Sequence, residues 1–281
     1  SRERSQPFFI YLHIREPHID FRMPPPFYKS FRKTFRDLPD DQFPEFIHDL
    51  YFGKGPWSRR KPDADELQLL SDSYDENLLS ADAAVGDLLD TIKQKGMEEN
   101  TLVVILGDHG EGLGEHGLIG HNVVLYREGV TVPLIVHHPG LTGNPLVNEL
   151  PFSTSDLTRT LAALAAKDAD KVKQSGIFAK EGRRVKVIRS IFFNRYYPHY
   201  VVEEGPYRAH LDLPWDKGVR RLFRIDNDPG EKTPVDDPRL LDHFAFQLRQ
   251  HLRLCFLSRS IAGKSSPSET ELKALKSLGY L

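Results

Sequence analysis

Three short runs of apolar residues limit the folds open to this 281-residue chain more than any other feature. They span residues 8–14, 102–106 and 132–136, and nearly every position in them is aliphatic or aromatic. Uninterrupted apolar runs of this length are typical of strands that are covered on both faces. We therefore expect three buried strands.

A helical pattern lies between the first and second runs. Apolar residues recur there at spacings of three and four, which predicts a one-faced amphipathic helix. The repeating positions are Leu67, Leu70, Tyr74, Leu78, Ala81, Val85, Leu88 and Ile92. Gly96 stands where this helix would end, and a second helix is expected at 155–166, capped by Ser153 or Ser155. Strands that alternate with helices predict an α/β domain, with a mostly parallel sheet and helices on both of its faces.

Two other regions have a different character. Residues 21–64 combine Pro, Gly and charged residues without a period, so we expect a long surface excursion of the kind that walls a pocket. Runs that predict antiparallel strands lie at 184–193, 195–203 and 219–225, and a helical pattern follows at 238–257. The predicted domains are therefore an α/β domain at 1–175 and a small antiparallel α+β subdomain at 176–281.

Composition excludes several classes of protein. The 38 Lys and Arg residues against 40 Asp and Glu residues leave a net charge of −2, which argues against a general nucleic-acid binder. No apolar run approaches the roughly 20 residues of a membrane span. The single cysteine excludes an internal disulfide and says nothing about the compartment. Because the first apolar run begins so close to Ser1, we expect a missing preceding segment, and a signal peptide there would direct the protein to the periplasm or outside the cell.

The stretch LVVILGDHGEGLGEHGLIGH carries the candidate chemistry. Asp108 and His109 directly follow a predicted strand, and ligands of open α/β sheets bind beyond the carboxyl ends of strands. Gly107 and Gly110 bracket the pair and permit a turn that would aim both side chains at one ion. A carboxylate beside a neutral imidazole suits a divalent cation. In the alternative interpretation, Asp108 caps the next segment and His109 is an ordinary polar residue.

Other polar residues could join this site. We expect Glu111 to support the site through second-shell hydrogen bonds, and Glu115 to support the loop or face solvent. If the first two strands run parallel, their carboxyl ends open on the same rim. The side chains that would then converge are His13, His18, Asp108, His109 and His121. His13 could instead be a buried strand histidine that is bonded to a carbonyl.

These motifs resemble the sulfatase family, within the alkaline-phosphatase-like superfamily. The resemblance rests on GDHGEGLGEHGLIGH followed by LYREGVTVPLIVHHPG, on FFIYLHIREPH followed by MPPPF, on LFRIDNDPGEKTPV and on the closing LKSLGYL. It covers most of the chain from residue 7 onward. The resemblance implies metal-dependent hydrolysis of sulfate esters in a sulfated small molecule or glycan.

The resemblance also implies roles for individual residues. Asp108 and His109 would be ligands of a divalent cation, usually calcium in this family, with magnesium or manganese as alternatives; His109 stands where many members carry Asn and others His. His121 would contact the ester anion. His18 would bind the sulfate or protonate the leaving oxygen, and we predict His13 as a further substrate-binding residue.

The chain departs from the family pattern in one respect. The family's nucleophile, a Cys or Ser in a C-x-P-x-R pattern, and two further Asp ligands do not occur in these 281 residues. Cys255 lies in CFLSR without the proline, and we expect it to be a core or partly buried helix residue. We therefore expect the isolated chain to be inactive. The alternatives are a phosphate or phosphonate ester hydrolase of the same superfamily, and a non-catalytic fragment or partner chain.

Overall fold

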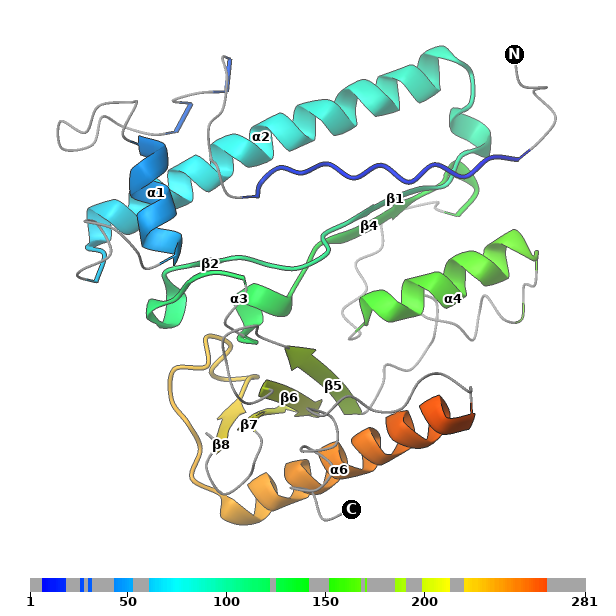
Figure 1. Ribbon diagram of the computed structural model, residues 1–281. Helices are drawn as coiled ribbons and strands as arrows, with labels where there is room; N and C mark the ends of the chain where they lie inside the picture. Colours follow the sequence, from blue (N-terminus) through cyan, green and yellow to red (C-terminus); the bar gives the residue numbers. More distant parts are fainter. Residues whose placement is uncertain are drawn as a thin grey trace. The chain divides into compact units, whose positions relative to one another are not determined.

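The computed structural model describes residues 7–18, 26–27, 30–31, 43–52, 61–121, 125–141, 152–167, 170, 185–190, 199–212 and 220–261 (Figure 1). The chain forms two compact units, and each has its own buried apolar cluster. Unit 1 comprises Ser1–Val103, Leu113–Ile119 and His137–Leu141, and unit 2 comprises Val104–Gly112, Gly120–Val136 and Thr142–Leu281. The predicted domain boundary at 175/176 stays a prediction. None of the described helices is both long and apolar enough to cross a membrane.

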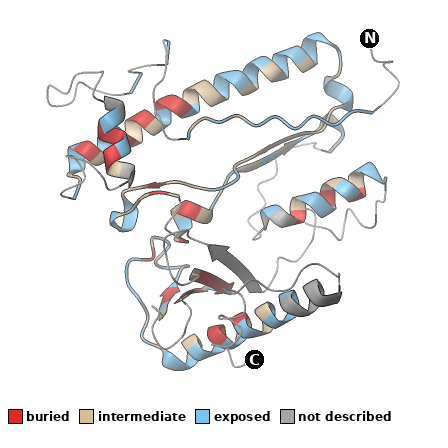
Figure 2. Ribbon diagram, viewed as in Figure 1, coloured by how far each residue is buried: buried red, intermediate tan, exposed pale blue. Residues whose placement is uncertain are grey.

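The long predicted helix of unit 1 is present as α2, Ala64–Gln94. Asp63 and Glu66 form a capping box at its start, and Gly96 adopts a φ of 63° just after its end. Only the first half of the helix is buried, as the red segments in Figure 2 show, and Leu78 and Leu89 are exposed. The amphipathic pattern therefore predicts the helix correctly but overstates how much of its stripe is covered.

Helix α1, Phe43–Phe52, lies inside the stretch that was expected to be a surface excursion, so that prediction is wrong for these residues. Phe46 and Ile47 are buried and pack with Leu69 and Leu70 of α2. The sequence FPEFIHDLYF has apolar residues at helical spacing. This segment is short, and the Pro-rich residues around it hide its helical pattern. Most of the remaining residues of 21–64 lie outside the described part of the chain.

The first predicted strand, at 8–14, is wrong for the structure as described. Residues 7–15 are extended (Figure 1) but take part in no strand ladder within the described residues. All of these residues except Ile14 are exposed, and the exposed fraction is 47% for Phe8 and 80% for Phe9. A buried strand needs a hydrogen-bonded neighbour and covering side chains on both faces, and the described residues supply neither here.

The second and third predicted strands are confirmed as β1, Val103–Leu106, and β4, Leu134–His137, which pair in a two-stranded sheet. They are half-buried rather than fully covered, and Ile135 is exposed. A larger, mostly parallel sheet with helices on both faces stays a prediction. Short elements lie before, between and after β1 and β4: η2 is Glu98–Asn100, β2 is Gly112–Leu113, η3 is Glu115–Gly117, β3 is Ile119–Gly120, α3 is Arg127–Val130 and η4 is Pro139–Leu141.

The predicted helix near residue 155 is confirmed as α4, Thr154–Ala165. Ser153 is its N-cap residue, as one of the two sequence-based alternatives has it. The Ser153 side chain forms no capping hydrogen bond. Serine is a common N-cap residue, but here it does not make the side-chain bond to the helix backbone that usually explains this preference.

A four-stranded antiparallel sheet in unit 2 confirms the antiparallel strands expected there. Its order is β5 (Val185–Ser190), β6 (His199–Glu204), β7 (Tyr207–Asp212) and β8 (Arg220–Arg224), with each strand paired to the next. Strand β7 was not predicted. Helix α6, Pro238–Ile261, packs on β6, β7 and β8 and begins where the sequence places it.

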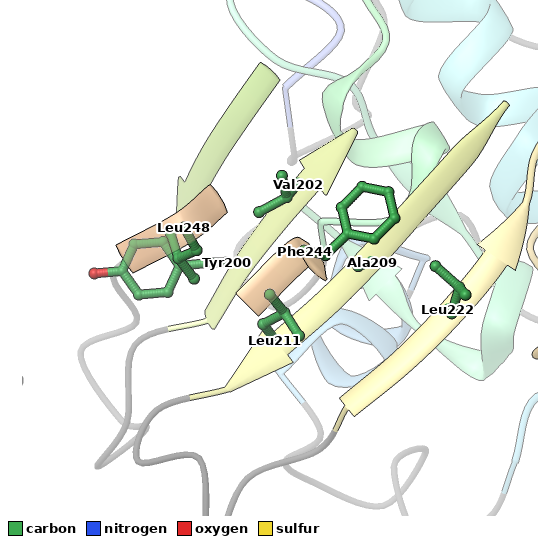
Figure 3. Close-up of a cluster of buried hydrophobic side chains, with 7 residues drawn as sticks. All are labelled: Tyr200, Val202, Ala209, Leu211, Leu222, Phe244 and Leu248. Atoms are coloured by element: carbon green, nitrogen blue, oxygen red, sulfur yellow. The ribbon is translucent and has the colours of Figure 1, made fainter. Parts of the chain in front are cut away.

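Alternation along the strands divides this sheet into an apolar face and a polar face. Side chains of the sheet and of α6 form one buried cluster between them: Tyr200, Val202, Ala209, Leu211 and Leu222 from the strands, and Phe244 and Leu248 from the helix (Figure 3). Because neighbouring residues of a strand point to opposite faces, Arg208 and His210 of β7 lie on the other face. Both are nevertheless buried, so the polar face is covered as well.

Cys255 lies in α6, as expected, but it is exposed rather than partly buried. Its Sγ lies 3.4 Å from Nε2 of His251 on the preceding turn. Burial along the helix falls from Phe244 and Leu248 to the exposed Leu254, because the sheet covers only the first turns. The prediction of a core cysteine is therefore wrong, while its assignment to a helix is confirmed.

Candidate metal and anion site

Asp108 and His109 form an exposed turn directly after β1. Their side chains are 76% and 42% exposed. The His109 amide donates to Asp108 Oδ1 at 3.0 Å. The amides of Gly107 and Gly110 donate to Pro133 and Gly129 carbonyls at 3.1 and 3.0 Å, so backbone bonds hold the turn on both sides of the pair.

The hydrogen bonds of His109 determine which ring nitrogen can bind a ligand. Nδ1 lies 2.9 Å from the Gly110 carbonyl oxygen, which can only accept, so Nδ1 carries the hydrogen. Nε2 of the neutral ring therefore presents a lone pair, and it lies 3.8 Å from Asp108 Oδ1. Ligand distances of about 2.0–2.6 Å allow two atoms at this separation to contact one ion. The pair fits two ligands of a divalent cation, and a backbone carbonyl orients the imidazole as metal-binding histidines require.

His121 lies against His109. The two rings are stacked, with centroids 4.0 Å apart and an interplanar angle of 28°. His121 Nδ1 lies 2.9 Å from Glu111 Oε2, and both side chains are largely buried. The carboxylate accepts from Nδ1, which places Nε2 on the opposite edge of the ring. Glu111 thus orients His121, and its second oxygen, Oε1, is buried with no hydrogen-bond partner in the described structure.

The structure brings together four of the predicted site residues, all in unit 2: Asp108, His109, Glu111 and His121. They do not amount to a complete ion shell, because the described residues contain no group of three or more acidic, His or Cys side chains that could hold a metal. Glu115 accepts from the Leu113 amide at 2.7 Å, which is the loop support that the sequence predicts.

His13 and His18 belong to unit 1. The His13 ring lies 6.3 Å from that of Tyr11, and the His18 amide donates to the Arg15 carbonyl at 3.0 Å. Their convergence with Asp108 stays a prediction.

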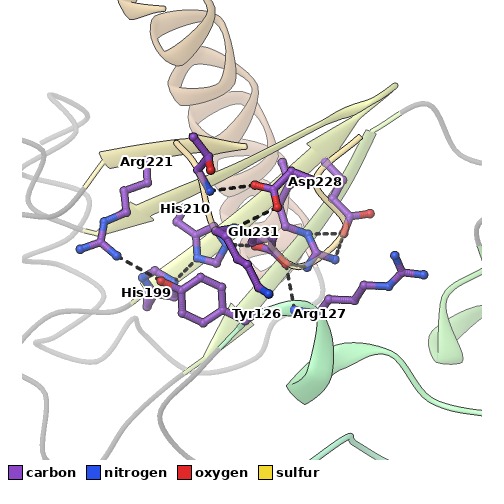
Figure 4. Close-up of polar contacts among 11 residues, drawn as sticks. Tyr126, Arg127, His199, His210, Arg221, Asp228 and Glu231 are labelled. Atoms are coloured by element: carbon purple, nitrogen blue, oxygen red, sulfur yellow. Dashed lines mark hydrogen bonds and ion pairs between the residues drawn. The ribbon is translucent and has the colours of Figure 1, made fainter. Parts of the chain in front are cut away.

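Sequence reasoning missed a buried polar network on the covered face of the antiparallel sheet (Figure 4). Glu231 Oε2 accepts from His210 Nε2 at 2.6 Å, and Glu231 Oε1 accepts from Arg208. Arg208 also donates to Glu203, and His210 Nδ1 lies 3.1 Å from His199 Nε2. A signal was present in the sequence, because Arg208 and His210 alternate with the apolar Ala209 and Leu211. Glu231 lies further along, in the turn sequence NDPGEK.

The network shifts the titration of its two central groups. Burial lowers the pKa of His210 below its usual 6.5, although the hydrogen bond to Glu231 opposes this. Burial alone would raise the pKa of Glu231, but the bond from His210 and the charge of Arg208 outweigh it and lower the pKa below 4.5. A neutral His210 that donates from Nε2 to Glu231 accepts at Nδ1, so the bond between the two rings runs from His199 Nε2 to His210.

Comparison with known proteins identifies the family. The family model Sulfatase matches residues 1–167. A choline-sulfatase of Rhizobium meliloti (strain 1021) is 35% identical over 101 residues, which are 36% of this chain and 19% of that protein. A solved 2-O GAG sulfatase matches with a TM-score of 0.55 at 20% identity, covering 78% of this chain and 46% of the other.

A phosphonate monoester hydrolase from Silicibacter pomeroyi matches with a TM-score of 0.60 at 20% identity, covering 84% of this chain and 53% of the other. The chain thus spans about half the length of these two solved structures. Identities this low show a shared fold alone, and the family assignment rests on the family model, which matches more than half of the chain. The chain belongs to the sulfatase family.

Proposed function

We propose that this protein takes part in the metal-dependent hydrolysis of sulfate esters, as a sulfuric ester hydrolase. The observation that carries the proposal is the arrangement around His109. Its Nε2 lies within reach of Asp108, and its ring is stacked on a second imidazole that a buried Glu111 orients. This arrangement supports an assignment in which two cation ligands lie next to a hydrogen-bond donor for an anion.

The residues have separable tasks in this proposal. Asp108 and His109 hold a divalent cation, most simply Ca²⁺, which supplies positive charge opposite the sulfate group when it is bound. His121 Nε2 donates to a non-bridging oxygen of the ester, while the Glu111 carboxylate compensates the charge on the ring. His18, and His13 with it, would serve the substrate, with His18 protonating the leaving oxygen.

The proposed substrate is a sulfated small molecule or a sulfated glycan. Both classes are represented among the relatives, since one is named a choline-sulfatase and another a 2-O GAG sulfatase. Nothing in the fold selects one of them, because specificity lies in site residues rather than in architecture. The nucleophile is not assigned, since the 281 residues contain no C-x-P-x-R pattern, and the chain alone should not turn over a sulfate ester.

The second candidate is a phosphate or phosphonate ester hydrolase. It is favoured by the structural similarity to a phosphonate monoester hydrolase, whose TM-score of 0.60 is slightly higher than the 0.55 of the 2-O GAG sulfatase. The same cation and donor would serve a phosphoryl group, because both anions present non-bridging oxygens that carry negative charge. A partner chain without turnover of its own is a third candidate.

The test has a binding part and a kinetic part. Calorimetric titration of the whole protein with CaCl₂, MgCl₂ and MnCl₂ should show one divalent site that is lost in Asp108→Asn. The whole protein is then assayed with 4-nitrophenyl sulfate, 4-nitrophenyl phosphate and a phenylphosphonate ester. Preferential hydrolysis of the sulfate supports the first candidate, and preferential hydrolysis of a phosphorus ester supports the second. A whole protein that binds none of the three cations would overturn the proposal.

A further inference from the structure

Glu231 is the most completely enclosed carboxylate of the buried network. Its side chain is 0% exposed. It accepts three hydrogen bonds, from His210 Nε2, from Arg208 Nη1 and from the backbone amide of Arg127 at 2.9 Å. Figure 4 shows Glu231 between the strand that carries His210 and the start of α3 at Arg127. One side chain thus joins the antiparallel sheet to a segment about a hundred residues earlier.

The turn that carries Glu231 is itself held firmly. Glu231 has a φ of 50°, a left-handed conformation that is unfavourable for any residue other than glycine. Its amide donates to the Asp228 carbonyl at 3.0 Å, and the Asp228 carboxylate accepts from the amides of Lys232 and Thr233 at 3.1 and 2.8 Å. A strained conformation persists when surrounding contacts determine it. The turn therefore presents Glu231 at a fixed place.

Tyr126, the residue before α3, is anchored to the same sheet. Its ring centroid lies 4.7 Å from that of His210 and 6.3 Å from that of Phe223. Its hydroxyl oxygen accepts from Arg221 Nη1 at 3.1 Å. Together with the bond from the Arg127 amide to Glu231, these contacts fix both the backbone and a side chain at the start of α3.

Helix α3 in turn contacts the Asp108–His109 turn. The Gly110 amide donates to the Gly129 carbonyl at 3.0 Å, and the backbones are so close that a Cβ atom on Gly110 would lie 1.9 Å from the Glu128 carbonyl oxygen. The Gly110 carbonyl is also the acceptor that fixes the ring of His109, at 2.9 Å. A displacement of α3 would therefore move the acceptor that orients His109.

We propose that Glu231 is a positioning residue for the Asp108–His109 cation site, acting through α3 and Gly110. The inference rests on the proposed function for the identity of the cation. The chain of contacts from Glu231 through α3 to Gly110 does not depend on it. Every contact in the path lies within unit 2. Glu231 touches neither Asp108 nor His109, so its effect on cation binding would be indirect.

The first test compares Ca²⁺ affinity in Glu231→Ala, Glu231→Gln and a matched control, Glu203→Gln. Glu203 binds the same arginine through Nε at 2.7 Å, so its replacement perturbs the network while the bond from Arg127 to Glu231 remains. We expect Glu231→Ala to weaken Ca²⁺ binding by about tenfold or more, in the range known for outer partners of metal ligands. Glu231→Gln should lose less because its amide oxygen can still accept from Arg127. Glu203→Gln should keep the wild-type dissociation constant even where its urea midpoint falls.

The second test needs no metal. Amide hydrogen exchange is measured for Gly110 and for Val235, whose amide donates to Leu222 within the sheet. In Glu231→Gln, exchange at Gly110 should accelerate by about tenfold relative to Val235. The contact between α3 and Gly110 should then open while the antiparallel sheet stays closed. Equal acceleration at both amides, or none at Gly110, would show that Glu231 only stabilises the fold and would overturn the inference. A wild-type whole protein that binds no Ca²⁺ would overturn the proposed function while leaving this second test intact.

Discussion

The exposed Asp108–His109 pair and the buried Glu231–His210 pair combine the same two chemical groups but differ in burial and in hydrogen bonding. Asp108 and His109 are 76% and 42% exposed, whereas the side chains of Glu231 and His210 are 0% and 3% exposed. Glu231 accepts from three protein donors, and Asp108 accepts from one backbone amide. The Asp108 carboxylate and the His109 ring are open to solvent, whereas the Glu231 carboxylate and the His210 ring are hydrogen-bonded within the protein.

This difference shows what decides the role of a carboxylate beside a histidine. Where the protein satisfies every polar atom, the pair is part of the fold, because an unsatisfied buried charge is costly. Where the ring nitrogen and the carboxylate oxygen remain open to solvent, the same pair can bind a ligand. Residue type alone does not distinguish the two, and each of the following predictions tests one side of the comparison.

The largest effect should follow from removing the positively charged side chain of Arg208 from the buried network. Arg208→Ala leaves Glu203 and Glu231 buried without their shared partner, and breaking a buried pair in this way costs about 3–5 kcal/mol. The free energy of unfolding, measured with urea, should fall by that amount. Arg224→Ala is the matched control: its pair with Asp226 is exposed, and its stability should be unchanged. Equal losses in the two variants would remove the distinction between buried and exposed charges.

The next effect concerns the exposed side and is kinetic. His121→Ala should lower kcat of the whole protein by about a hundredfold, because the lost donor acts mainly on charge that develops in the transition state. Ca²⁺ affinity should stay the same, since the ring is assigned to the anion and not to the ion. Loss of the metal in this variant would make His121 a ligand and would favour the phosphorus-ester candidate.

A smaller but more selective effect is expected at Asp108. Asp108→Asn keeps the size of the side chain and removes its charge, so Ca²⁺ affinity should fall by at least about tenfold, with turnover falling in parallel. The urea midpoint without metal should not move, because the side chain is exposed and substitutions at such sites change stability by less than about 0.5 kcal/mol. Unchanged calcium binding would eliminate the cation site, and a large loss of stability would place Asp108 with the buried cluster.

The exposed site could be predicted from the sequence because its signal is local. Asp108 and His109 are adjacent, they follow a recognisable strand, and two glycines mark the turn. His121 was within reach of the same local pattern. The strands β1 and β4 and the helices α2, α4 and α6 also follow from periodicity within short windows.

The buried network could not be predicted in this way because its partners are distant along the chain. Arg127, Arg208 and Glu231 meet only after the sheet has formed, and Glu231 adopts a backbone conformation that no periodic pattern predicts. Residues 8–14 failed for a related reason. Their composition specifies a strand, but a strand also needs a neighbour that composition does not supply.

The smallest effect is the pH dependence of stability, and its sign follows from the two shifted groups. The pKa of His210 is lowered from 6.5 chiefly by burial, so the folded protein binds fewer protons there than the unfolded chain. The pKa of Glu231 is lowered from 4.5 because the bond from His210 and the charge of Arg208 outweigh burial, which gives the same imbalance at lower pH. The free energy of unfolding should therefore fall as the pH drops through 6.5, and fall again below 4.5.

Urea unfolding at about pH 8, 5.5 and 4 would measure both steps. These pH values lie on either side of the ordinary pKa values of histidine, about 6.5, and of glutamate, about 4.5. His210→Asn keeps a donor towards Glu231 but has no titrating group, so the first step should shrink while the second persists. His243→Asn, at an exposed histidine of α6, should keep the wild-type profile. If the protein instead gained stability between about pH 8 and 5.5, His210 would be charged in the fold, and it would then donate from both ring nitrogens, to Glu231 and to His199. That result would contradict the direction in which burial shifts the pKa of His210, and the contrast with the open turn at Asp108 would no longer rest on a neutral buried ring.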